Sequence, residues 1–141
     1  MNGHGDPVTT LRRTTSLALL TAVIVGLLAA APASAAWKKT LTWKGAVTQA
    51  CRAPQADGDL RVKVRLNNRD GKAGSTGGLN RVRADGSTGN AWTYTRHVRP
   101  GKISNVVSLD FARGSKVYLL IGSDVGITGE RIIKVSALPR C

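Results

Sequence analysis

The chain has 141 residues, which suffices for one domain and excludes a large multi-domain enzyme. It carries 21 Lys and Arg against 8 Asp and Glu, a formal net charge of +13, and 42% of its residues are hydrophobic. This composition excludes an acidic solubilising tail, and the hydrophobic content excludes wholesale disorder because it is high enough to form a packed core.

The first 35 residues have the parts of a secretory signal peptide. Arg12 and Arg13 precede an apolar run over 17–31, and small residues follow at Ala33-Ser34-Ala35. A membrane anchor is the rival interpretation, because the uncharged stretch 14–37 is 24 residues long and a membrane-spanning helix needs about 20.

The end of the apolar run favours cleavage over anchoring. Pro32 interrupts the run, and the small residues that follow it match a cleavage site after Ala35 or after Ala36. We therefore predict a signal peptide over 1–35 and a secreted, extracellular all-β domain over 36–141. Cleavage would remove two arginines and one aspartate, so the domain keeps 19 Lys and Arg against 7 Asp and Glu. No transmembrane segment is expected within it.

Cys51 and Cys141 are the two cysteines of the chain, and both fall in the expected domain. An even number of cysteines in an exported protein predicts a disulfide, here across a separation of 90 residues. Such a bond would hold the last strand near the end of the first. A zinc site would need further ligands, and His97 is the sole histidine after residue 35. We therefore expect one disulfide, no metal ion and no cofactor.

Hydrophobic and polar residues alternate along most of the domain, which is typical of strands with one buried face. The clearest segment is 60–66, where Leu and Val alternate with Arg61, Lys63 and Arg65. Further strands are expected at about 41–51, 79–84, 91–98, 102–112, 117–121 and 131–138.

Turn-forming dipeptides separate several of these segments: Asp57-Gly58, Asp70-Gly71, Asp85-Gly86 and Pro100-Gly101. About seven strands at intervals of roughly ten residues predict an all-β fold, either a single antiparallel β-sandwich or a small barrel. Within 41–51 the alternation places Leu41, Trp43 and Cys51 on one face. No stretch of the domain predicts a helix.

The candidates for catalysis are His97 and Glu130, the sole histidine and the sole glutamate of the domain. Together with an arginine they match the Glu, His and Arg composition of small secreted ribonucleases. Those enzymes place the glutamate before the histidine and pack a helix on their sheet, whereas here the order is reversed. A secreted nuclease is therefore kept as an alternative, and a protein without catalytic activity is expected.

The positive charge points to an anionic partner. Arg61, Lys63 and Arg65 are expected on one face of their strand, and Arg81 and Arg83 lie in the glycine-rich stretch 67–91. Side chains on one face of a strand are about 6.6–7 Å apart, close to the spacing of charges along an extended polyanion. The alternative is a solvated strand face whose cations deter aggregation.

The leading hypothesis is a non-enzymatic binding module for anionic material. Its partners would be anionic polymers of the cell envelope, extracellular nucleic acid or acidic polysaccharide. A secreted inhibitor or antimicrobial protein is a further alternative. Trp92 and Tyr94 share one side of their segment, and we expect them to be buried inside the sandwich rather than to form a stacking platform.

Overall fold

The computed structural model describes Met1 and residues 36–141, so the expected signal peptide lies outside the described residues. Residues 36–141 form nine strands and one short 3-10 turn. In chain order these are β1 (Lys38–Trp43), β2 (Ala46–Pro54), β3 (Leu60–Asn68), β4 (Ser75–Arg81), β5 (Thr93–Tyr94), β6 (Lys102–Ile103), β7 (Val107–Phe111), β8 (Lys116–Ser123), β9 (Gly126–Lys134) and η1 (Val135–Ala137).

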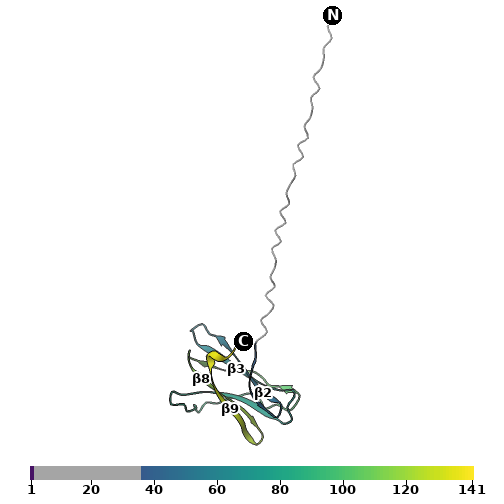
Figure 1. The fold of residues 1–141 in the computed structure, drawn as a ribbon, viewed down its shortest axis with the longest axis vertical. Coiled ribbons are helices and arrows are strands. Elements are labelled where there is room, and N and C mark those ends of the chain that lie inside the picture. Colours follow the sequence, from purple (N-terminus) through teal and green to yellow (C-terminus); the bar gives the residue numbers. More distant parts are fainter. Residues whose placement is uncertain (2–35) are drawn as a thin grey trace. The chain divides into compact units, whose positions relative to one another are not determined.

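The strands form two antiparallel sheets, which confirms the predicted all-β fold and selects the sandwich over a closed barrel. The first sheet, sheet A, has the order β1-β2-β3-β6, with β7 pairing the other end of β3 on the same side as β6. The second, sheet B, has the order β5-β4-β8-β9. Figure 1 labels β2 and β3 from sheet A and β8 and β9 from sheet B.

The core lies between the inner faces of the two sheets. Val62 and Val64 of β3 are fully buried, as predicted from the alternation in 60–66, and they pack in one cluster with Leu79 of β4 and Leu119 of β8. Each large aliphatic side chain removed from water contributes about 1.5–3 kcal/mol, so this layer provides the main driving force for folding.

The expected first strand is instead a hairpin, which corrects the predicted faces within 41–51. Lys44 and Gly45 both have positive φ (42° and 83°), as a two-residue turn between paired strands requires, and the chain reverses there. Leu41 and Trp43 therefore pack inward, whereas Cys51 lies opposite the outward Lys63 of β3. The residues on either side of the two-residue turn, Trp43 and Ala46, pair directly and so share a face although they are three positions apart. The alternation therefore changes phase at the turn, and residues before and after it do not lie on the faces that an unbroken strand would give them.

Two other segments are shorter or more divided than predicted. The segment 91–98 forms a strand only at β5, with one further isolated bridge between Val98 and Ser75, and 102–112 is split into β6 and β7. The main-chain N–H of Leu66 donates a hydrogen bond to the hydroxyl of Ser104. In a continuous strand a main-chain carbonyl would accept this hydrogen bond. A side chain thus interrupts the ladder between β6 and β7.

The predicted Cys51–Cys141 disulfide is confirmed, with the two Cα atoms 5.1 Å apart. It joins β2, rather than the end of the first strand, to the end of the described chain. After β9 the chain turns through η1 and runs beside β2, where Arg52 N donates to Pro139 O and Cys141 N donates to Arg52 O, both at 2.9 Å. The chain therefore crosses from sheet B to sheet A, and the disulfide fixes that crossing.

We predict that the double substitution Cys51→Ala and Cys141→Ala lowers the free energy of unfolding by about 4 kcal/mol, because it restores the freedom of a long loop in the unfolded chain. Urea unfolding of the oxidised protein and of the variant measures this difference. Reduced wild-type protein is the matched control and should unfold like the variant. Equal stability of the oxidised protein and the variant would contradict the prediction.

Candidate functional site

The three predicted cations of β3 all lie on the outer face of sheet A. Val62, Val64 and Leu66 are fully buried, so the intervening Arg61, Lys63 and Arg65 point to the opposite side. On neighbouring strands, Lys39 of β1 pairs with Gln49 of β2, and Gln49 pairs with Arg65. Directly paired residues share a face, so Lys39 joins this surface. We call Lys39, Arg61, Lys63 and Arg65 the basic face.

Arg61 is neutralised within the basic face. Its Nε lies 2.7 Å from Oδ1 of Asp110 on β7, and its Nη2 donates to Oδ2 at 2.8 Å, a bidentate pair. The hydrogen bond from Arg61 is the main reason that the pKa of Asp110 is below its usual value, and the same bond raises the pKa of Arg61. Arg61 therefore forms a cross-strand ion pair with Asp110, and the pair contributes little net charge to the surface.

Arg65 keeps its charge and is held in position. Its guanidinium stacks over Trp37, with the Cζ atom 4.3 Å from the ring centroid, and its Nε donates to Oε1 of Gln49 at 2.9 Å. Burial, and to a smaller extent the neighbouring charge of Arg69, lower the pKa of Arg65 from its usual value. A guanidinium remains protonated at neutral pH despite such a shift. Arg65 is thus a pre-oriented cation whose Nε is occupied by Gln49 and whose two Nη groups have no hydrogen-bond partner among the described residues.

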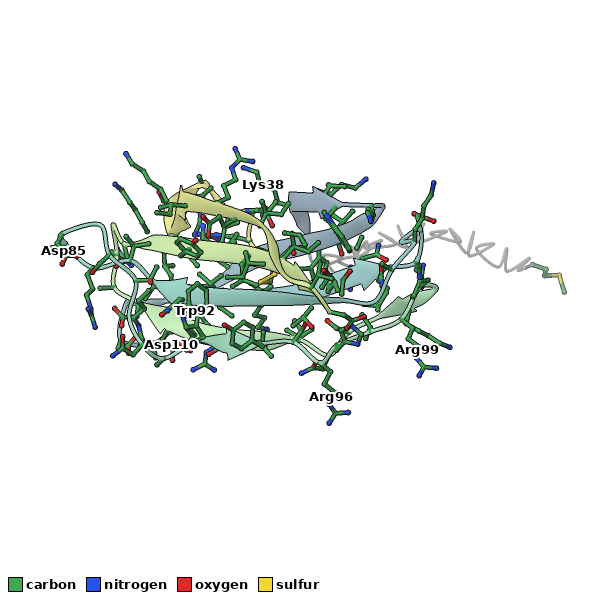
Figure 2. The ribbon with its side chains drawn as sticks, turned by 90° about the horizontal axis from the view of Figure 1, so that it is seen from below. Lys38, Asp85, Trp92, Arg96, Arg99 and Asp110 are labelled. Carbon is green, nitrogen blue, oxygen red and sulfur yellow. A yellow bond between two sulfur atoms is a disulfide. The ribbon has the colours of Figure 1, made fainter. Side chains whose placement is uncertain are left out.

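Arg81 and Arg83, also predicted to bind, do not belong to the basic face. Arg81 ends β4 in sheet B, and its guanidinium donates twice to the main-chain oxygen of Asp110, at 2.8 and 3.1 Å. Arg83 lies in the loop between β4 and β5, near Asp85 at its tip (Figure 2). The pKa of Asp85 is lowered mainly by hydrogen bonds from Ser87 and further by Arg83.

The two candidate catalytic residues lie in different surroundings. His97 Nε2 lies 3.0 Å from Oδ1 of Asp124, beside Gly74. Glu130 lies on β9 and lines a shallow hollow of about 270 Å³ with Tyr118, Arg131 and Ile132. His97 and Glu130 thus have different neighbours: Asp124 for His97, and Tyr118, Arg131 and Ile132 around Glu130. Among residues 36–141 no three His, Cys, Asp or Glu side chains gather at one point.

Trp92 and Tyr94 lie outside the sandwich, which corrects the expectation of burial within it. Tyr94 is 49% exposed, and its ring lies against Gly78 on the outer face of sheet B. Trp92 stacks on Tyr94 at 5.9 Å and meets Tyr118 edge-on at 5.2 Å. The small Thr95 fills the inner position instead. Alternation showed that the two aromatic residues share a side, but it does not reveal which side faces the core.

Sequence reasoning did not assign Lys39, Gln49 or Trp37 to this surface. Lys39 and Gln49 belong to it only through the β1–β2 hairpin, whose Lys44-Gly45 turn was missed. Trp37 is half-buried under Arg65. The sequence feature that could have pointed to these residues is the pair of lysines, Lys38 and Lys39, next to Trp37.

No protein-family model and no curated protein sequence matches the chain. Among solved structures, beta-glucosidase 3B from Thermotoga neapolitana in complex with glucose is similar over 67% of this chain, with 19% sequence identity and a TM-score of 0.33. The matched part spans 16% of that enzyme's chain. A similarity this low carries no argument about function. No helix formed by the described residues is long and apolar enough to cross a membrane.

We predict that the Arg61–Asp110 pair stabilises the protein at neutral pH and loses its effect in acid. The pKa of Asp110 is lower in the folded than in the unfolded chain, where it is about 3.9. The contribution is therefore complete above about pH 4 and disappears as the pH falls through the folded value. Melting temperatures of wild type and Asp110→Asn from pH 7 to pH 2 should differ most at pH 7 and converge in acid.

Arg61→Gln is the matched control for Asp110→Asn, since it removes the other half of the same pair. The double variant should melt close to either single variant at pH 7. Strictly additive losses would show that the two side chains do not act as a pair.

Proposed function

We propose that residues 36–141 form a non-enzymatic binding module for anionic polymers, with the basic face as its contact surface. One observation carries the proposal: of the 19 Lys and Arg in this range, Arg61 alone has a carboxylate oxygen of residues 36–141 within 4.0 Å. Most of the positive charge is therefore not engaged in close ion pairs, and it attracts polyanions through screened Coulomb forces.

The geometry of the basic face supports an extended ligand. Lys63 and Arg65 are neighbours on one side of β3, about 6.6–7 Å apart at the spacing of a strand. Lys39 lies two strands away in the same row as Arg65, about 10 Å across the sheet. Three free cations at such intervals can contact successive charges of one extended polymer. Arg61 was also expected to bind the polymer, but its ion pair with Asp110 excludes it from these free cations.

The ordering of Arg65 adds to this support. The stack on Trp37 and the bond to Gln49 fix its guanidinium before any ligand arrives. Binding then loses less side-chain entropy than it would for a free arginine. The remaining Nη donors suit phosphate or carboxylate oxygens.

The separation of His97 from Glu130 favours binding over the nuclease alternative. His97 pairs with Asp124, and Glu130 lies among Tyr118, Arg131 and Ile132. We propose an extracellular location, with anionic polymers of the envelope or extracellular nucleic acid as partners. The disulfide is compatible with an oxidising compartment.

The test is binding of single-stranded poly(U) and of poly(glycerol phosphate) at rising salt. For poly(U), the affinity of wild type should fall linearly in a plot of log affinity against log salt. The triple variant Lys39→Gln, Lys63→Gln and Arg65→Gln should bind more weakly and reduce the magnitude of that slope by about 2, since each lost phosphate contact on a single strand accounts for about 0.7.

The matched control neutralises Lys72, Arg96 and Arg99 with the same substitutions and so changes net charge equally. Arg96 and Arg99 project into solvent at the edge of the molecule away from Lys38 (Figure 2). The control should keep most of the affinity and of the salt slope. Salt-insensitive binding by wild type, or equal losses in the two triple variants, would refute the basic face as the contact surface.

A further inference from the structure

A second cationic feature lies where the chain end returns to sheet A. Three arginines from separate segments line one hollow of about 340 Å³: Arg52 of β2, Arg113 of the β7–β8 turn, and Arg140 near the chain end. Its volume falls within the range of small-ligand sites, about 300–1,000 Å³. Pro54 and Leu60 supply an apolar wall. None of these three arginines belongs to the basic face.

Arg52 and Arg140 are held side by side by the fold. They form a parallel β-bridge, and each is the chain neighbour of a cysteine of the Cys51–Cys141 disulfide. Like charges in directly paired positions destabilise a sheet. The disulfide and the two main-chain hydrogen bonds of Arg52 maintain this arrangement against that repulsion. Proteins tend to break a local rule of this kind at functional sites, and a bound anion would relieve the repulsion between the two arginines.

Two of the guanidiniums are anchored in a way that leaves their ends free. Arg52 Nε donates to Leu138 O, and Arg113 Nε donates to Gly58 O, both at 2.8 Å. In each case the Nε is occupied, and the terminal Nη groups remain for a ligand. Anchoring through main-chain oxygens also leaves the full positive charge in place.

The acidic residues nearby do not neutralise the hollow. Asp57 and Asp59 flank Gly58, the residue that Arg113 contacts, but neither lines the hollow. No carboxylate oxygen of residues 36–141 lies within 4.0 Å of the side-chain nitrogens of Arg52, Arg113 or Arg140.

We propose that this hollow is a binding site for a single phosphate group. Guanidinium donors that approach from three segments match a tetrahedral oxyanion, whose oxygens accept hydrogen bonds in several directions. A carboxylate offers two oxygens whose acceptor sites lie in one plane, and it matches donors from three directions less well. Ser136 adds a hydroxyl to the lining. The site is separate from the basic face, and it does not depend on the proposed binding of polymers.

The experiment is a titration of the oxidised protein with sodium phosphate at constant ionic strength, followed by NMR at the arginine Nε–H groups. Wild type should show saturable shifts at Arg52 and Arg113. Arg140→Gln should weaken phosphate binding about tenfold, because it removes one charge-assisted contact while its main-chain bridge to Arg52 is unaffected. Arg99→Gln, which removes the same charge from an exposed position elsewhere, should bind like wild type.

Acetate and sulfate titrations test the class of anion. Sulfate binding near the strength of phosphate with weak acetate binding supports a tetrahedral-oxyanion site. Acetate binding as strong as phosphate, the absence of saturable shifts, or equal losses in Arg140→Gln and Arg99→Gln would overturn the proposal. The phosphate titration tests the hollow and the poly(U) assay tests the basic face. Failure of one proposal therefore does not affect the conclusion on the other.

Discussion

The covalent link between Cys51 and Cys141 is the constraint on which the arrangement of the two layers most depends. The last long strand, β9, belongs to sheet B, whereas the residues after it pair with β2 of sheet A. Without the bond, a chain end of a few residues would exchange with solvent and leave Arg52 N–H and C=O without their partners. The same bond brings Val135 and Leu138 into the core cluster, where both are almost completely buried. Packing and covalent closure therefore reinforce each other.

The distribution of charge follows from this architecture. The inner faces are filled by aliphatic residues, so the cations must lie on outer faces, at sheet ends and in loops. With seven acidic residues in 36–141, most of these cations have no carboxylate to pair with. They instead donate to main-chain oxygens, as Arg52, Arg81 and Arg113 do, or stack on rings, as Arg65 does. Such contacts hold a guanidinium in place without cancelling its charge, which leaves these groups available to external anions.

The sequence was most informative where local periodicity decides the structure. The alternation in 60–66 correctly separated the buried valines from the outward cations, because a strand has a fixed period of two. It was not informative about long-range register. Arg61 meets Asp110 only because β3 pairs with β7, and nothing local connects residues so far apart in the chain. The Lys44-Gly45 turn was missed since Lys is an unusual residue at a position with positive φ.

For the arginine-lined hollow, a usable signal was present in the sequence. Once Cys51 and Cys141 are expected to be bonded, their neighbours Arg52 and Arg140 must lie close together. The disulfide was predicted from the sequence. The proximity of Arg52 and Arg140 also requires that the chain be extended at both cysteines, which the structure establishes. Arg113 carried no comparable signal, because it reaches the hollow from a turn whose position depends on the whole sandwich.

The ends of the sheets bear on how copies of this protein behave at high concentration. Sheet B finishes on one side in β5, which has two residues, and sheet A finishes in β6 and β7, which are separate pieces of two and five residues. An unpaired strand edge recruits strands from other molecules in proportion to the length of ladder that it offers. Edges this short give an incoming strand few hydrogen bonds, and so the domain is protected from fibrillar self-association through these sides.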